Sequence, residues 1–294
     1  MEGQRKISIR FYNDREVRAV WDDETAKWWF SVLDIIGAIN GQDDYTRTRN
    51  YWKYLKSKLR KQGSELVSAT NQLKLRAADG KRYLTDVLDY NGVLSLAENI
   101  PNSNATRFVH WFASDRDSID GKSREKAYAI WDSGLMDSVE IGTTRGLQQI
   151  HGYLFGGLYD FAGQIRNVTI SKGGFTFCRA QYLCQALKEI DAMPDDTFDQ
   201  IVAKYVEMNV AHPFMEGNGR STRLWLDLLL KNRIAKCVDW SRITKRDYMT
   251  AMVLSATDLT MLYGLLKGAL TDKVDDRETF LKGIDYSYYY EQAD

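Results

Sequence analysis

The segment from His212 to Arg220 reads His-Pro-Phe-Met-Glu-Gly-Asn-Gly-Arg and brings together an imidazole, a carboxylate, two glycines and a guanidinium. Gly217 and Gly219 flank Asn218, so the backbone there can adopt conformations that are closed to other residues. Its amides can then point together at the start of a following helix, where proteins commonly bind phosphate. The segment therefore predicts an anion-binding loop.

The charged residues beside this loop point to phosphoryl-type transfer. Arg220 and Arg223 are three apart and share one face of the first helical turn, where a cation is normally unfavourable. Glu216 fits a Mg²⁺ ion that bridges its carboxylate and two phosphate groups and is held mainly by the substrate. His212, with an ordinary pKa of ~6.5, can take a proton from an attacking hydroxyl.

A plainer interpretation is a capped helix, a glycine turn and solvated arginines. The complete run of residue types favours the transfer site over this alternative. A helix–loop–helix setting argues against a dinucleotide-binding fold, and the sequence contains no Gly-x-x-x-x-Gly-Lys-Ser/Thr phosphate loop.

The same segment matches, residue for residue, the His-Pro-Phe-x-Asp/Glu-Gly-Asn-Gly-Arg signature of the Fic family of AMP transferases. The chain resembles that family from about Ser123 to Gln292, including Val139–Ile150 and Gly157–Arg166. The resemblance implies transfer of AMP from ATP to a Tyr, Thr or Ser hydroxyl of a target protein, with pyrophosphate leaving. ATP would be the substrate and Mg²⁺ the cofactor.

The resemblance also implies a role for each residue. His212 would be the general base, Phe214 would anchor the loop in the core, and Glu216 would hold Mg²⁺. The α- and β-phosphates would meet Gly217, Asn218 and Gly219, the β-phosphate Arg220, and the γ-phosphate Arg223.

A β-hairpin is predicted where Val168–Ser171 and Phe175–Phe177 flank Lys172-Gly-Gly174, because the glycines allow positive φ. It resembles the flap with which the family holds an extended target by strand addition. The flap positions are Ser171, Lys172, Gly173 and Gly174.

Residues 275–292 predict a helix with acidic residues at its start. Ser287 and Glu291 resemble the Ser/Thr-x-x-x-Glu-Gly/Asn motif of Fic proteins with a C-terminal inhibitory helix, although Gln292 departs from its last position. In that scheme Glu291 pairs with Arg223 and takes it from the γ-phosphate. The alternative is an ordinary helix with packing or surface tyrosines, which are also candidates for self-modification: Tyr286, Tyr288, Tyr289 and Tyr290.

The elements that must position these residues are mostly helical. An amphipathic stripe from Phe198 to Val206 belongs to a helix that cannot continue through Pro213. Leu224–Leu230 is apolar on nearly every side and predicts the central helix of a bundle. We expect a mainly α-helical Fic domain over residues 122–294, preceded by a polar boundary at Ser114–Gly121.

Residues 1–121 predict a small α+β domain, and the overall class is α+β. The evidence is a hairpin from Val17–Trp21 and Trp28–Val32, a helix from Leu33, a strand near Leu73–Arg76, and helices over Val87–Glu98 and Ala105–Ala113.

The balanced total of 40 basic and 40 acidic residues hides a basic stretch between Arg47 and Arg82. With Trp28, Trp29 and Trp52 this stretch could form a nucleic-acid surface, and a solvated helix face is an equal alternative. Scattered positions in residues 1–121 loosely resemble the BRO-type domain of phage antirepressor-like proteins, which is linked with DNA binding. DNA is therefore a candidate partner of residues 1–121.

Length and composition exclude wholesale disorder, because 294 residues with 44% hydrophobic side chains can bury a sizeable core. The sequence shows no secretory apolar stretch and no uncharged apolar run of ~18 residues, so no membrane partner is expected. Cys178, Cys184 and Cys237 fit free thiols in the cytoplasm. His110 and His151 are predicted to be packing residues rather than metal ligands.

We therefore predict an N-terminal recognition domain joined to a protein adenylyltransferase that is restrained by its own C-terminal helix. The rival prediction is a DNA-binding regulator whose second half senses a nucleotide or mediates assembly. The identity of the target and a homo-oligomeric state stay open.

Overall fold

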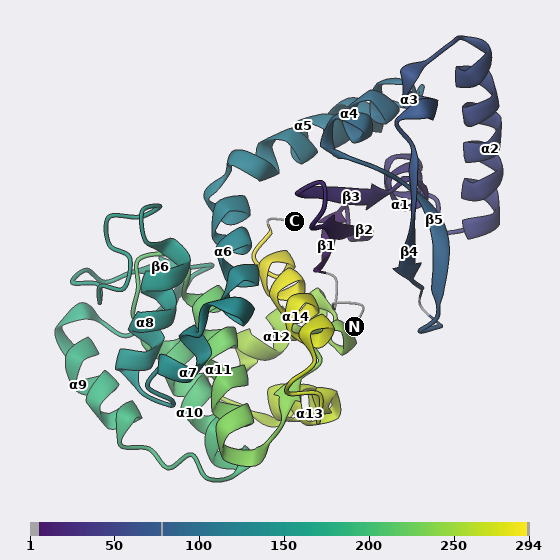
Figure 1. The fold of residues 1–294 in the computed structure, drawn as a ribbon. Coiled ribbons are helices and arrows are strands. Elements are labelled where there is room, and N and C mark those ends of the chain that lie inside the picture. Colours follow the sequence, from purple (N-terminus) through teal and green to yellow (C-terminus); the bar gives the residue numbers. More distant parts are fainter. Residues whose placement is uncertain (1–5, 78, 293–294) are drawn as a thin grey trace. The chain divides into compact units, whose positions relative to one another are not determined.

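A computed structural model of the chain describes residues 6–77 and 79–292. The chain divides into two compact units between Ser118 and Ile119 (Figure 1). Helix α5 (Ser103–Asp117) closes the first unit and α6 (Ile119–Ser133) opens the second, so the polar passage predicted as a boundary is helical on both sides of Ser118. Asp120 therefore belongs to the second unit.

The first unit contains a five-stranded antiparallel sheet in the order β1-β2-β3-β5-β4. The predicted hairpin is formed by β2 and β3, where Val20 pairs with Trp29. The strand β1, in which Ser8 and Arg10 alternate with apolar residues up to Phe11, is an addition to the prediction. The strands are β1 (Ile7–Tyr12), β2 (Arg15–Asp22), β3 (Lys27–Ser31), β4 (Asn71–Arg76) and β5 (Arg82–Leu88).

Helices of the first unit share an apolar core with the sheet, in which Ile35, Val93 and Phe108 are fully buried. Besides α5, they are α1 (Val32–Asn40), α2 (Tyr45–Lys61), α3 (Glu65–Ser68) and α4 (Tyr90–Glu98).

Two predictions in this unit are wrong. Val87 and Leu88 end β5 instead of starting a helix, because a short buried apolar run fits either element. The helix begins at Tyr90, after Asp89 caps its N-terminus. His110 is exposed rather than packed, because it lies opposite the buried face of α5 that carries Phe108 and Phe112.

The second unit is mainly helical, and together the two units confirm the predicted α+β class. Its central element is α11 (Asn218–Ile234), which packs against α8, α10 and α14 and buries most of its first half. The other elements are α7 (Leu135–Ser138), α8 (Thr144–Phe155), α9 (Ala180–Asp191), α10 (Phe198–Ala211), the 3₁₀ turn η1 (Trp240–Arg242), α12 (Lys245–Leu254), α13 (Thr260–Ala269) and α14 (Arg277–Tyr289).

Two short strand pairs accompany these helices. The predicted hairpin is formed by β6 (Ser171–Lys172) and β7 (Phe175–Thr176). The second pair, β8 (Cys237–Val238) with β9 (Leu270–Thr271), joins segments that are distant in sequence and was not predicted. All three cysteines are free thiols.

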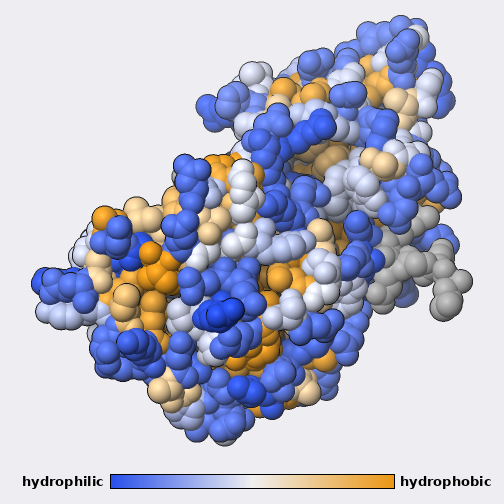
Figure 2. Space-filling model, turned by 60° about the vertical axis from the view of Figure 1, so that its left-hand side comes forward, coloured by the Kyte–Doolittle hydropathy of each residue, from blue (hydrophilic) through white to orange (hydrophobic). Residues whose placement is uncertain are grey.

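The surface of the molecule mixes hydrophobic and hydrophilic residues (Figure 2). In Figure 2, hydrophobic residues on the visible face lie in separate patches among hydrophilic ones. Over the two described stretches of chain, no helix is both long enough and apolar enough to span a bilayer.

Candidate active site

The candidate site is the turn between α10 and α11. Helix α10 starts at a capping box of Thr197 and Gln200 and ends at His212, whose φ of 49° is left-handed. Pro213 follows and prevents the helix from continuing. Gly217, with φ 81°, is the N-cap of α11. The first amides of α11 therefore lack carbonyl partners within the helix.

Side chains inside the turn fix its shape. The side-chain oxygen of Asn218 accepts from the Phe214 amide, and its nitrogen donates to the Phe214 carbonyl, both at 2.8 Å. Phe214 itself is fully buried. The side-chain amide of Asn218 is thus used within the turn. The amide groups that remain to meet a phosphate are the backbone N–H groups at the start of α11.

His151 supports the turn from α8. Its ring stacks on Phe214 with centroids 3.8 Å apart. Its Nε2–H donates to the Glu216 carbonyl at 2.9 Å, while its Nδ1 accepts from the Gly163 amide at 2.8 Å. Burial lowers the pKa of His151 to about 4, so the ring is neutral at pH 7. His151 is thus a packing residue, as predicted.

His212 is held in a form that can accept a proton. Its Nδ1 lies 3.3 Å from the Asn209 carbonyl, which can only accept, so Nδ1 carries the hydrogen and Nε2 has a free lone pair. Its ring stacks on Phe177 with centroids 3.7 Å apart and planes 14° apart. Burial lowers the pKa of His212 to about 4, and the charges of Lys172 and Arg166 act in the same direction.

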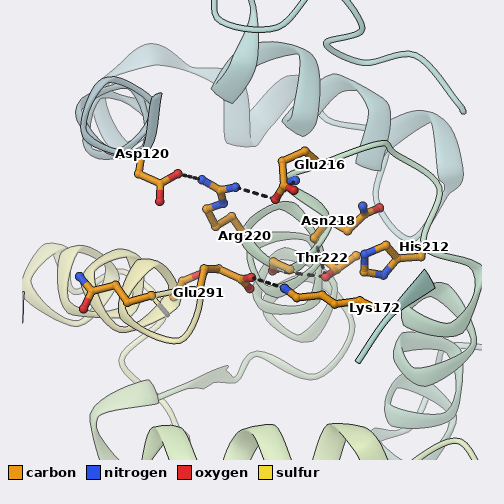
Figure 3. A network of polar contacts seen from close by, with 12 residues as sticks. Asp120, Lys172, His212, Glu216, Asn218, Arg220, Thr222 and Glu291 are labelled. Atoms are coloured by element: carbon orange, nitrogen blue, oxygen red, sulfur yellow. Dashed lines mark hydrogen bonds and ion pairs between the residues drawn. The ribbon is translucent and has the colours of Figure 1, made fainter. Parts of the chain in front are cut away.

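Arg220 is buried, and Figure 3 shows it between the carboxylates of Asp120 and Glu216. It donates to Asp120 of α6 and, at 3.3 Å, to Glu216. Its guanidinium lies 4.9 Å from the ring centre of Phe155 and 5.5 Å from that of Tyr288. Against the effect of burial, the charge of Asp120 raises the Arg220 pKa. Asp120 was missed by the sequence analysis, and only the fold brings it here.

Arg223 is buried and contacts the segment predicted to be inhibitory. It donates to the Ser287 hydroxyl at 2.8 Å, to the Ser287 carbonyl at 2.7 Å and to the Glu291 carboxylate at 2.6 Å. Ser287 belongs to α14, whereas Glu291 lies in the turn beyond the C-cap Tyr290. The structure therefore brings Arg223, Ser287 and Glu291 together.

The Glu291 carboxylate reaches over the start of α11 toward the hairpin (Figure 3). Its second oxygen lies 3.9 Å from the Lys172 ammonium. A side chain at Gly219 would overlap this carboxylate, so only glycine leaves it room. Burial would raise the pKa of Glu291, but the charge of Arg223 and its hydrogen bond lower it below the usual value.

The hairpin turns on Gly173 and Gly174, whose φ values of 59° and 82° match a two-residue type I′ turn. The hydroxyls of Ser171 and Thr176 hydrogen-bond across it at 2.9 Å. The hairpin is exposed, and Phe177 connects it to the His212 ring. The structure thus places the predicted flap residues beside His212.

The metal-ligating groups near Glu216 fit a metal ion that is bound mainly by phosphate. Glu216 is 57% exposed, and its Oε1 accepts from the Gly217 amide at 3.0 Å. In the part of the chain that the structure describes, no three His, Cys, Asp or Glu residues form a metal-binding group. A single exposed carboxylate is a typical protein contribution to a Mg²⁺ ion that keeps waters and binds nucleotide phosphates.

Comparisons with known proteins place this turn in a family. The Fic/DOC family model matches residues 142–230. The probable protein adenylyltransferase Fic of Escherichia coli (strain K12) is 30% identical over 144 residues, which are 42% of this chain and 70% of that protein.

Two further proteins are similar over other shares of their length. Protein adenylyltransferase VbhT of Bartonella schoenbuchensis is 30% identical over 120 residues, which cover 37% of this chain and only 25% of that protein. The solved type IV secretion system effector protein BepA is similar with a TM-score of 0.47 and 20% identity, covering 61% of this chain and 66% of the other. From the extent of the match to the Escherichia coli protein, the chain belongs to the Fic/DOC family.

Proposed function

We propose that the chain is a protein adenylyltransferase that moves AMP from ATP to a hydroxyl of a target protein. The observation that carries this proposal is the neutral His212 imidazole with a free Nε2 lone pair, in the same turn as the N-terminus of α11, whose N-cap Gly217 offers no side-chain partner to the first amides. A proton acceptor next to a phosphate-binding helix terminus is what hydroxyl attack on a nucleotide requires. The adenylyltransferase names of the relatives support this choice of reaction.

The proposed reaction needs only ATP, the target hydroxyl and a proton acceptor. The target hydroxyl oxygen bonds to the α-phosphorus of ATP while the bond from that phosphorus to the bridging oxygen breaks. The hydroxyl proton passes to Nε2 of His212, and pyrophosphate leaves. The α11 amides and Arg220 stabilise negative charge on the phosphates, and the flap around Lys172 orients an extended target segment beside His212.

Glu216 is the residue that would hold Mg²⁺, because its carboxylate is exposed at the edge of the phosphate site. The bound ion would neutralise phosphate charge. The chain's own part is to keep Glu216 in place through the Gly217 amide and Arg220.

The contact between Arg223 and Glu291 supports autoinhibition within this function. Arg223 is the residue proposed for the γ-phosphate, and in the structure it donates to Ser287, Tyr248 and Glu291. A carboxylate in this position competes with a phosphate for the same guanidinium. The C-terminal helix α14 would thus hold the enzyme in a form of low activity.

The test uses the full chain with Mg²⁺, a lysate and ATP labelled on either the α- or the γ-phosphate. We expect protein labelling from α-labelled ATP only, and a rise of about 10- to 100-fold in Glu291→Gly, because hydrogen bonds to charged groups contribute ~1.5–3 kcal/mol. His212→Ala in the Glu291→Gly chain should lose about 10²–10⁴-fold, the usual share of a general base.

The matched control is His110→Ala, which removes an exposed histidine of the first unit and should leave labelling unchanged. Labelling that survives His212→Ala, or that follows the γ-phosphate, would contradict AMP transfer. An unchanged rate of protein labelling in Glu291→Gly would refute the proposed autoinhibition.

A second candidate function, nucleic-acid binding by the first unit, is favoured by the surface of α2. Its apolar face packs into the core through Trp52, Leu55 and Leu59, and the helix contains no acidic residue. The remaining faces expose basic side chains: Arg47, Arg49, Lys53, Lys58, Arg60 and Lys61. Such a helix supplies the electrostatic part of binding to a phosphate backbone.

A further inference from the structure

Arg166 is a buried arginine at the edge of the site, only 5% exposed. Its guanidinium donates to four backbone carbonyls. Nε donates to His212 at 2.7 Å, and one terminal nitrogen donates to Val168 at 2.5 Å. The other donates to Cys178 at 2.5 Å and to Ala211 at 3.0 Å. Over residues 6–77 and 79–292, no carboxylate is an ion-pair partner of Arg166.

These carbonyls belong to two parts of the site. Ala211 and His212 end α10, whereas Val168 and Cys178 lie on the two sides of the flap hairpin. Backbone bonds follow the same course, since the Arg166 amide donates to Pro213 at 2.9 Å and the Cys178 amide donates to Val210 at 3.1 Å. Arg166 therefore ties both ends of the flap to the turn that carries the proposed base.

The arginine stabilises a strained position. A left-handed backbone at a residue other than glycine is unfavourable and persists only where neighbouring structure enforces it. His212 has this conformation, and Arg166 holds the carbonyls of His212 and of the residue before it. A cation is also favourable at the C-terminus of a helix, where carbonyls lack amide partners.

The charge of Arg166 acts on the imidazole as well. Burial is the main cause of the lowered His212 pKa; the charges of Lys172 and Arg166 lower it further, while the Asn209 hydrogen bond and the Glu291 charge raise it. Among the described residues no carboxylate is paired with Arg166, so its positive charge can act on His212.

We propose that Arg166 is a positioning residue of the site, which fixes the backbone of His212 and the two sides of the flap in one arrangement. It touches neither phosphate nor target in this scheme. Its part in catalysis rests on the proposed AMP transfer, whereas its hold on His212 does not.

The test compares Arg166→Met and Arg166→Lys with Arg145→Met, all in the Glu291→Gly chain. Arg145 is a suitable control because its side chain is 79% exposed and forms only a surface pair with Glu140 at 3.6 Å. Three quantities are measured: protein labelling, MgATP affinity by calorimetry, and the titration of His212 by NMR of ¹⁵N-histidine. The chain contains only three histidines, which simplifies the assignment.

We expect Arg166→Met to lower kcat for labelling by about 100-fold, the scale of a 1 Å misplacement, with less than about threefold change in MgATP affinity. The His212 pKa should rise in Arg166→Met, because a positive charge is lost. Arg166→Lys keeps the positive charge but not the planar guanidinium. The His212 pKa should therefore stay low in this variant, while kcat recovers only in part.

Unchanged kcat in a folded Arg166→Met chain, or an equal loss of kcat and MgATP affinity, would overturn the proposal. If Arg166→Met does not fold, Arg166→Lys decides by the same criteria. If the Glu291→Gly chain labels no protein, the proposed function fails, and the histidine spectrum still tests Arg166: His212 signals identical to those of the Arg145→Met control would refute its hold on the base.

Discussion

The residue that defines this site is a histidine whose two nitrogens have different tasks. Nδ1 of His212 is committed to the Asn209 carbonyl, and stacking on Phe177 shields one face of the ring from water. A buried imidazole resists protonation, since the charged form loses its hydration. His212 is therefore ready to act as a base well below neutral pH.

The pH dependence of labelling should report this shift. The base must be neutral and its pKa is about 4 rather than the usual 6.5, so kcat/KM in Glu291→Gly should stay near its plateau down to about pH 5. Removing Glu291 also removes a charge that raises the His212 pKa. MgATP affinity measured over the same range corrects for titration of the nucleotide. An acid limb centred near pH 6.5 would contradict the burial argument.

Most residue types of the site could be predicted because they are consecutive. Residues 212–223 carry the proposed base, the carboxylate, the glycines and both arginines. Asp120 could not be predicted, since it pairs with Arg220 from 100 positions away and no local pattern marks it. The carbonyl partners of Arg166 were equally hidden, because backbone oxygens have no sequence signal.

At the scale of elements, α14 is held in place by polar contacts to α6. The buried Asp285 accepts from the Tyr128 hydroxyl, and the Tyr288 hydroxyl donates to Ser123 at 3.0 Å. Tyr128 and Ser123 both belong to α6. Since α6 also carries Asp120, one helix contacts Arg220 directly and supports the helix that precedes Glu291.

Loosening α14 should therefore change activity without altering the nucleotide site. Tyr128→Phe removes a donor to a buried carboxylate, so we expect a loss of about 1–3 kcal/mol in the free energy of unfolding and higher labelling than in the native chain. Urea unfolding and α-labelled ATP measure the two effects. The matched control is Tyr263→Phe, because the Tyr263 hydroxyl donates to Asp199 on the surface at 2.8 Å. Equal effects of the two variants would refute this role of the α6 contact.

The flap hairpin offers a second prediction at this scale. Gly174→Val places a β-branched residue at a φ of 82°, which should distort the turn. We expect protein labelling by Glu291→Gly to fall at least tenfold with MgATP affinity retained, as target and nucleotide would use different parts of the proposed site. Gly268→Ala on α13 is the control, since an added Cβ there meets open space. A parallel loss of MgATP affinity would show that the flap is not specific to the target.

Elements were predictable where a strong local signal exists. The Gly-Gly turn and the apolar helix α11 have such signals. The β8–β9 pair does not, because each strand is two residues long and its partner is distant in sequence. Val87 and Leu88 show the same limit, since their strand pairing is set by β3 and not by their own pattern.

At the scale of the whole molecule, the chain combines an α+β unit that carries the basic helix α2 with a Fic unit, in a protein of zero formal net charge. Charge is unevenly distributed within this balanced total, because α2 exposes basic side chains that the total conceals. This distribution makes the ionic-strength dependence of the full chain informative.

Duplex DNA should bind the full chain in a salt-dependent manner. If Arg49, Lys53 and Lys61 each contact a phosphate, changing all three to Gln should reduce the slope of log K against log salt by about 3, since each contact contributes ~0.9. The control changes three exposed basic residues of the second unit to Gln: Lys122, Arg145 and Lys188. No binding at low salt, or equal slopes for the two triple variants, would refute a DNA surface on α2.

The ion pair of Arg223 with Glu291 also bears on the concentration of ATP that the proposed enzyme would need. Because Glu291 is tied to the same chain, under the proposed autoinhibition it would compete with ATP as a tethered ligand, whose effective concentration is on the order of millimolar for a short flexible link. Such competition does not weaken on dilution of the protein. Under the proposed autoinhibition, the level of ATP needed for half-maximal labelling would therefore be set within each molecule, by how often the turn after α14 releases Arg223.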